Sequence, residues 1–206
     1  MLAAMHHRLS GHGGQDVLFS GRGSRIYDRI AGILLRRLYQ RVAAEVDAAV
    51  PSGAAVLDVG TGPGRLLVEL ARRRPDLRLT GVDLSADMVA IAQRNVRRAG
   101  QEGQVEVRRA DVAALPFEDG AFDLVVSTLS LHHWGVVRVA VTELARVLRP
   151  GGALWIYDLH SVADVLVAAA DEAFPGRPLR PTFLGGGRLH LRPVVRWTVE
   201  RPPAAA

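Results

Sequence analysis

The stretch from Val56 to Gly64 constrains the fold more than any other part of this chain. An apolar run ends in an acidic residue, Asp58, and glycines then follow at alternate positions: Gly60, Gly62 and Gly64. Glycine lets the chain turn sharply and lets backbone N–H groups approach a ligand closely. The helical pattern that follows would present free N–H groups and the positive end of a helix dipole to that ligand. The stretch therefore predicts a strand, a loop and a helix that together hold a nucleotide-containing cofactor.

Strand and helix patterns alternate along most of the remaining chain. The expected strands are 54–59, 77–84, 105–109, 122–128 and 153–159, and the expected helices are 65–74, 87–99, 136–148 and 162–174. Such alternation predicts right-handed crossovers and a parallel sheet covered on both faces. A helix is expected to be weak or missing within 110–120, which holds Pro116 and acids rather than an apolar stripe. Residues 194–200 have strong β propensity and could form an antiparallel edge strand.

Length and composition fit one domain. The chain has 206 residues, 49% of them hydrophobic, which is enough for a single sizeable core. Residues 1–24 show no periodicity and predict a mobile arm. Apolar residues at every fourth position from Ile30 predict an amphipathic helix that ends before Pro51 and covers the active-site side. We expect one domain over 25–200, with a cap helix at about 25–50 and a cofactor-binding core at about 54–160, and a disordered tail at 201–206.

Missing residue types exclude several kinds of chemistry. All 26 basic residues are arginine, so a lysine Schiff base and a Walker-type phosphate lysine cannot occur. The absence of cysteine excludes disulfides, thiolate nucleophiles and cysteine metal sites. No run approaches the ~20 apolar residues of a membrane span, and we expect a cytoplasmic protein without membrane contact. The net charge of +5 could indicate nucleic-acid binding, but the arginines are dispersed along the chain, so a nucleic acid is not the expected partner.

Acidic residues at the ends of neighbouring strands bear on the identity of the cofactor. Glycine comes one residue early at Gly64, and Arg65 takes the place of the third glycine of a dinucleotide fingerprint, which argues against NAD. Asp83 ends the second strand, where a carboxylate can accept hydrogen bonds from both ribose hydroxyls. Asp111 follows the third strand and could meet the adenine amine, while Asp58 could accept from a cationic amino group. Three such acids predict a nucleoside that carries an ammonium or sulfonium group.

Six segments together resemble a known family: 56–64, 81–85 with Met88, Asp111 with 115–117, 122–127, 131–134 and 146–152. Over roughly residues 25–160 the chain resembles the class I S-adenosylmethionine-dependent methyltransferases, in the group that includes the ubiquinone/menaquinone-biosynthesis C-methyltransferases. The resemblance implies an α/β, Rossmann-like, doubly wound sheet of seven mostly parallel strands, with an antiparallel edge strand and helices on both faces. It also implies S-adenosyl-L-methionine as cofactor, S-adenosyl-L-homocysteine as product, and in-line methyl transfer to an oxygen, nitrogen or carbon of a small-molecule acceptor.

The resemblance also assigns roles to particular positions. Gly60, Thr61, Gly62 and Gly64 would lie against the methionine part of the cofactor, with Asp58 nearby. Asp83 would bind the ribose, Leu84 and Met88 would pack against the adenine, and Asp111 with the Val112 backbone would read the adenine amine. Ser127 would line the cofactor pocket, and Tyr27 would close over the cofactor. No metal is expected, because Asp158 and His160 are only two candidate ligands and no third is evident.

The acceptor side is the part that the sequence describes least. His132 and His133 follow the fourth strand, and either imidazole could act as a general base or have a structural role in the cofactor cleft. Residues 174–189 are rich in proline and glycine instead of forming the longer lid of many relatives, so either the pocket is open or a partner subunit, as in a homodimer, completes it. A catalytically silent cofactor-binding sensor or partner subunit, a nucleic-acid methyltransferase and a nicotinamide-dependent oxidoreductase remain alternatives.

Overall fold

The computed structural model describes residues 35–184 and 194–203. The predictions for the arm at 1–24, for Tyr27 and for residues 204–206 lie outside these ranges. The helices are α4 (Arg36–Ala49), α5 (Arg65–Arg73), α6 (Ala86–Arg98), α7 (Val137–Val147) and α8 (Ala163–Ala173), with 3-10 turns at η1 (Leu131–His133) and η2 (His160–Val162). The strands are β1 (Ala55–Val59), β2 (Arg78–Asp83), β3 (Val105–Arg109), β4 (Phe122–Thr128), β5 (Leu148–Leu159), β6 (Arg180–Phe183) and β7 (Val194–Glu200).

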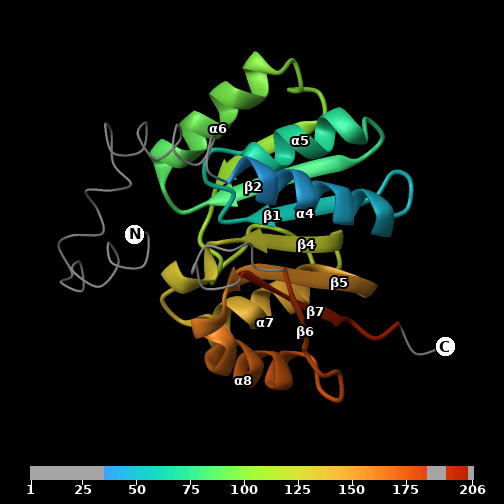
Figure 1. The fold of residues 1–206 in the computed structure, drawn as a ribbon, viewed down its shortest axis with the longest axis vertical. Helices are drawn as coiled ribbons and strands as arrows, with labels where there is room; N and C mark the ends of the chain where they lie inside the picture. The colour runs from blue at the N-terminus through green and yellow to red at the C-terminus, as the bar shows by residue number, and fades with distance from the viewer. Residues whose placement is uncertain (1–34, 185–193, 204–206) are drawn as a thin grey trace.

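The strands form one sheet in the order β3-β2-β1-β4-β5-β7-β6. The first five strands of this order are parallel, and β7 is antiparallel to both of its neighbours. Helices α4, α5 and α6 cover one face and α7 and α8 cover the other (Figure 1). The predicted fold class, a doubly wound and mostly parallel sheet, is therefore confirmed.

Each face of the sheet has its own apolar core because strand side chains alternate between faces. In the central strand β1, Leu57 and Val59 pack with the residues of α7 and α8, whereas Val56 packs with those of α4 and α5. All five residues of β1 are buried, as expected for a strand with parallel neighbours on both sides and helices above and below. This double burial explains why β1 reads as an almost continuous apolar run in which Asp58 is the exception.

The antiparallel end of the sheet differs from the sequence prediction in one respect. Strand β7 is antiparallel as expected, but it is not the outermost strand, because β6 pairs with its free side. The sequence did not predict a strand within 180–183, where Pro181 removes a backbone N–H donor. An edge strand tolerates proline because one of its two sides needs no partner. All four residues of β6 are exposed, which is consistent with that edge position.

Two connections follow from local sequence features. No helix lies between β3 and β4, as predicted, and the segment is instead held by an isolated bridge between Asp111 and Ala114. Strand β5 begins at Leu148, five residues before the predicted start, and its pairing with β4 shifts register between Phe122 and Leu124. The glycines at 151 and 152 account for this irregular start, since Gly151 has a φ of +80° and a Cβ at Gly152 would crowd the Asp123 carbonyl.

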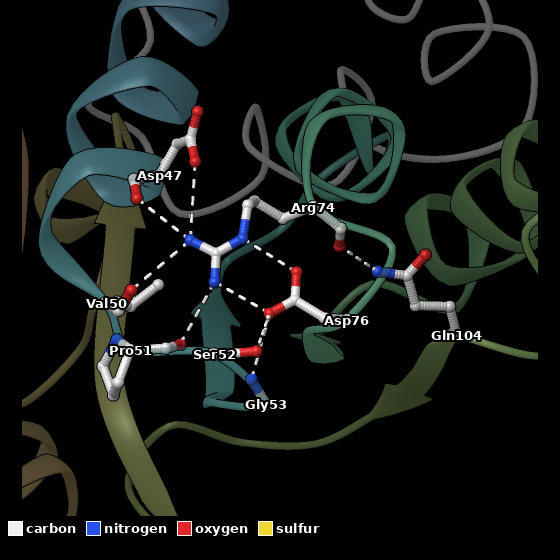
Figure 2. A network of polar contacts seen from close by, with 8 residues as sticks. All are labelled: Asp47, Val50, Pro51, Ser52, Gly53, Arg74, Asp76 and Gln104. Carbon is white, nitrogen blue, oxygen red and sulfur yellow. Dashed lines mark hydrogen bonds and ion pairs between the residues drawn. The ribbon is translucent and has the colours of Figure 1, made fainter.

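Arg74 joins α4 to the edge of the sheet where the strands begin (Figure 2). Its guanidinium donates to the Asp47, Val50 and Pro51 carbonyls at 3.0–3.4 Å, which satisfies carbonyls at the end of α4 that have no partner within the helix. It also donates to both carboxylate oxygens of Asp76 at 2.8 Å, and this pairing holds the pKa of Asp76 well below its usual range. Helix α4, which corresponds to the predicted cap helix, is therefore anchored at the edge of the sheet where the strands begin, opposite the edge formed by their carboxyl ends.

Arg201, where the predicted tail begins, is held by the domain. Its guanidinium donates to the carbonyls of Ala145, Arg146 and Leu148 at the end of α7, and its backbone pairs with Gly151 and Gly152. Within 35–184 and 194–203, no helix is both long enough and apolar enough to cross a membrane.

Candidate functional site

The parallel strands bring the expected site residues to one edge of the sheet. The glycine loop follows β1, Asp83 ends β2, Asp111 follows β3, and the two histidines follow β4. In open α/β sheets, ligands bind in the crevice outside the carboxyl ends of the strands, where the strand order reverses. Here the order reverses between β1 and β4, which lie side by side at the centre.

The glycine loop has a backbone that side chains rarely adopt. Gly60, Gly62 and Gly64 have φ values of +67°, +52° and +71°. A Cβ at Gly60 would come closer than 3.0 Å to the side chain of Ser130, so this position requires glycine for packing. A Cβ at Gly62 would meet nothing within 4 Å, although the residue lies in the middle of the loop. The open space beside Gly62 is where a ligand could approach the backbone closely.

Asp58 is a buried carboxyl group below the loop. It is 2% exposed, and it accepts a 2.7 Å hydrogen bond from the hydroxyl of Thr61. Burial raises its pKa to about 7; the nearby charge of Asp83 acts in the same direction, and the Thr61 hydrogen bond opposes the shift. A positively charged ligand beside this carboxyl would favour its ionised form.

Asp83 connects the glycine loop to the end of β2. Its Oδ2 accepts the Gly62 N–H at 2.8 Å and its Oδ1 accepts the Ser85 N–H at 2.9 Å. Burial raises its pKa, and these two backbone hydrogen bonds oppose the rise. The carboxylate therefore fixes the loop conformation itself, while each oxygen keeps a further lone pair for a ligand. Its predicted contact with a ribose stays a prediction.

The residues expected around an adenine lie at the ends of β2 and β3. Leu84 is 61% exposed, whereas Met88 is buried in the first turn of α6 and donates its N–H to the Ser85 hydroxyl. Asp111 is exposed, and its Oδ1 accepts the Ala113 N–H at 2.9 Å, while Val112 packs against the core under α7 and α8. An exposed leucine beside a partly used carboxylate can offer an apolar surface and a hydrogen-bond acceptor to a flat heterocycle.

A buried hydroxyl network, which sequence reasoning missed, supports the loop from β4. The Ser130 hydroxyl donates to the Val59 carbonyl at 3.1 Å and accepts the Trp134 indole N–H at 3.2 Å. It lies 2.7 Å from the Ser127 hydroxyl, which must be the donor because the hydrogen of Ser130 is already used. Ser127, expected to line the cofactor pocket, is fully buried within this network. No local pattern could reveal Ser130, since its loop partner is 71 positions away in the chain.

The two histidines, which the sequence could not distinguish, have different surroundings. Nδ1 of His132 lies 2.9 Å and 3.2 Å from the two carboxylate oxygens of Asp158, which is 0% exposed and also accepts the Leu159 N–H. His133 is exposed, and its ring centre lies 4.1 Å from that of His132. Asp158 accepts from the imidazole, so Nδ1 carries the proton and Nε2 is the basic nitrogen. This pair is the arrangement of an oriented general base.

Two further features complete this end of the sheet. Leu129, between β4 and η1, has a φ of +55°, an unfavourable value for a leucine, and its N–H donates to the Tyr157 carbonyl at 2.7 Å. The turn that carries His132 is thus held tightly against β5. In the part of the chain that the structure describes, no three histidine, aspartate or glutamate side chains gather as metal ligands, and Asp158 pairs with His132 rather than with His160.

Comparisons with known proteins agree with this geometry. Residues 56–152 match the model of a family described as a methyltransferase domain. The demethylmenaquinone methyltransferase of Thermus thermophilus is 40% identical over 103 residues, which are 50% of this chain and 46% of that protein. The 27-O-demethylrifamycin SV methyltransferase of Amycolatopsis mediterranei is 34% identical over 152 residues, which are 72% of this chain and 49% of that protein. The chain thus spans about half the length of the curated relatives it matches.

Solved structures show the same fold at lower identity. A SAM-dependent methyltransferase from Aquifex aeolicus superposes with a TM-score of 0.65 at 22% identity, covering 79% of this chain and 88% of that one. The [4+2]-cyclase SpnF superposes with a TM-score of 0.71 at 21% identity, covering 82% of this chain and 81% of that one. One fold therefore serves different reactions, and the reaction has to be argued from the site.

Proposed function

We propose that this chain, whose residues 56–152 form a methyltransferase domain of the class I S-adenosylmethionine-dependent family, transfers a methyl group to a hydroxyl of a small-molecule acceptor. The observation that carries the proposal is the His132–Asp158 pair at the ends of β4 and β5. A hydroxyl is a poor nucleophile until its proton is removed, and an imidazole oriented by a carboxylate is suited to removing it. The relatives whose names state the methylated atom include O- and C-methyltransferases.

The residues at the strand ends fit S-adenosylmethionine. The open space beside Gly62 would admit the cofactor to the loop backbone, and Asp58 and Asp83 supply two carboxyl groups whose pKa values burial raises. Among the described residues, no arginine pairs with either carboxyl group, so a cationic ligand would supply the positive charge that favours their ionised forms. When bound, the cofactor would supply an electrophilic methyl group on a sulfonium, and in-line attack on that carbon would release S-adenosylhomocysteine. NAD, with its anionic pyrophosphate, fits these acids poorly.

The chain's own residues position the acceptor and accept its proton. Nε2 of His132 would take the proton of the acceptor hydroxyl as the oxygen attacks the methyl group. Asp158 would hold the imidazole in the right tautomer and stabilise the positive charge that forms on it. General-base catalysis of this kind contributes about 10²–10⁴-fold, while holding the two reactants in register supplies about 7–11 kcal/mol. His133, which is exposed, is not needed for this step.

Two measurements test the proposal in sequence. Calorimetric titration with S-adenosylmethionine, S-adenosylhomocysteine and NAD should show binding of the first two only. Formation of S-adenosylhomocysteine with a panel of hydroxyl acceptors should then fall steeply in His132→Gln, and His133→Gln is the matched control that keeps turnover. Binding of NAD alone, or equal activity in both variants, would contradict the proposal.

The remaining alternatives predict different results. A silent cofactor-binding sensor would bind S-adenosylmethionine and turn over no acceptor, while a nucleic-acid methyltransferase would bind RNA or DNA with a steep salt dependence. We keep the small-molecule acceptor because the relatives with named substrates act on small molecules. The cytoplasmic location and the homodimer both stay predictions.

A further inference from the structure

Two aromatic rings stack at the surface near the end of β5. The rings of His160 and Phe183 have centres 5.9 Å apart and planes inclined by 17°. Phe183 is 58% exposed although it belongs to a strand, and His160 is exposed as well. Within the described residues, the other large apolar side chains with comparable exposure are aliphatic. The aromatic pair is therefore the part of the surface best suited to stack on another flat ring.

The strand register places Phe183 two strands away from Asp158, the carboxylate that holds the proposed base. Asp158 is the register partner of Val195 on β7, and Val195 is the partner of Phe183 on β6. Register partners point to the same face, and Val195 packs in the core under α7 and α8. Because neighbouring strands lie about 4.8 Å apart, the Cα atoms of Asp158 and Phe183 are separated by roughly 10 Å. His160 begins η2 directly after β5, and its ring is placed by its stacking on Phe183.

We propose that Phe183 and His160 form the surface on which a flat, ring-bearing part of the acceptor stacks, so that the preferred acceptor is an aromatic hydroxyl compound of bicyclic or larger size. This inference rests on the proposed methyl transfer to a hydroxyl. Asp158, which holds His132, lies two strands and roughly 10 Å from Phe183, so an acceptor that stacks on Phe183 and also presents a hydroxyl to His132 has to be larger than a single small ring. A small aliphatic alcohol cannot contact both.

The size argument and the stacking argument point to the same class of compound. An offset stack of aromatic rings contributes more binding free energy than its buried apolar area alone provides. A saturated ring of the same size lacks this additional contribution. The acceptor surface should therefore discriminate between flat and puckered rings. Naphthol and its saturated counterpart decalol have the same carbon skeleton and one hydroxyl each, so they differ in ring planarity at nearly the same size, and comparing each compound between wild type and Phe183→Leu cancels the different acidity of the two hydroxyls.

The test measures naphthol binding by its own fluorescence, with the full chain saturated with S-adenosylhomocysteine. Phe183→Leu keeps apolar bulk but removes the ring, and His160→Ala removes the second ring; each should weaken naphthol binding about tenfold. His160→Phe should retain binding because it keeps a ring, and Val165→Ala, which changes an exposed apolar residue on α8, is the matched control. Decalol, which does not fluoresce and is measured by its displacement of naphthol, should bind wild type more weakly than naphthol and should bind Phe183→Leu equally well.

Several outcomes would overturn the inference without touching the proposed reaction. Naphthol binding that is equal in wild type and Phe183→Leu would remove the stacking role, even if both proteins methylate an acceptor. Sedimentation that finds a wild-type dimer and a Phe183→Leu monomer would show that this face joins two copies of the chain instead. Failure of the proposed function would look different, because wild type would then bind no S-adenosylmethionine or transfer no methyl group to any acceptor.

Discussion

Substituting Gly62 with alanine tests whether the loop holds the cofactor, because the structure separates its effect on folding from its effect on binding. Gly62 has a φ of +52°, and a Cβ there would meet no protein atom within 4 Å. Gly100, which follows the C-terminal end of α6 and lies outside the glycine loop, has a φ of +68° and equally open surroundings. The two positions impose the same kind of backbone strain and differ in whether a ligand is expected beside them.

The expected cost to folding is therefore similar for the two variants. An alanine in the left-handed region lowers the free energy of unfolding by about 1–2 kcal/mol. Part of this loss, about 0.4–1 kcal/mol, is offset because the unfolded chain has less conformational entropy with alanine than with glycine. A net loss near 1 kcal/mol lowers the Tm of a chain of this size by about 2–4 °C. Gly60→Ala should lower the Tm further, because its methyl group would also collide with the side chain of Ser130.

Cofactor binding should distinguish the two variants. The methyl group of Gly62→Ala would occupy the space that we assign to the cofactor, and overpacking of about 1.4–3 kcal/mol corresponds to a loss of about 10- to 150-fold in affinity. Titration calorimetry with S-adenosylhomocysteine measures the affinity, and thermal unfolding without ligand measures the folding cost. Wild-type affinity in Gly62→Ala would refute the placement of the cofactor, and so would an equal loss of affinity in Gly100→Ala.

Five further expectations follow from the contacts and the pKa shifts. Asp158→Asn should lower kcat by about 10²–10⁴-fold with an unchanged Kd for S-adenosylhomocysteine, since it affects the base and not the cofactor; a matched loss in Kd would argue for a structural role. The affinity for S-adenosylmethionine should rise with pH up to about 7 and then level off, because Asp58 must ionise to attract the positive charge of the cofactor. Asp58→Asn should flatten this profile in calorimetric titrations. The same raised pKa means that the unliganded protein loses stability as pH rises from about 4 to 7, measured by urea unfolding across that range. Ser130→Ala should lower the free energy of unfolding, measured with urea, by roughly 1–3 kcal/mol, because it leaves the buried partners of the hydroxyl unpaired. Arg74→Met should lower the Tm without changing cofactor affinity, because it removes hydrogen bonds far from the candidate site.

Local sequence patterns were sufficient to predict most of the helices and strands and the cofactor side of the candidate site. The glycines, Asp83 and Asp111 stand directly after strands, and the carboxyl ends of parallel strands meet at one edge, so their approximate gathering follows from the order of elements alone. The weak segment between β3 and β4 could also be predicted, because a missing apolar period is itself local information. The short edge strand β6 could not, because it has only four residues, one of them Pro181, and its pairing comes from β7.

What the sequence determined by itself is the alternation of strands and helices, the loop after β1 and the acids at the strand ends, because each depends on neighbours within a few positions. Only the tertiary structure decided that His132 pairs with Asp158, that Ser130 supports Gly60, and that Phe183 and Asp158 share the register partner Val195. Those pairs are separated by tens of residues in the chain. A strand's periodicity states which face a side chain occupies, but only the order and register of the assembled sheet state what lies beside it.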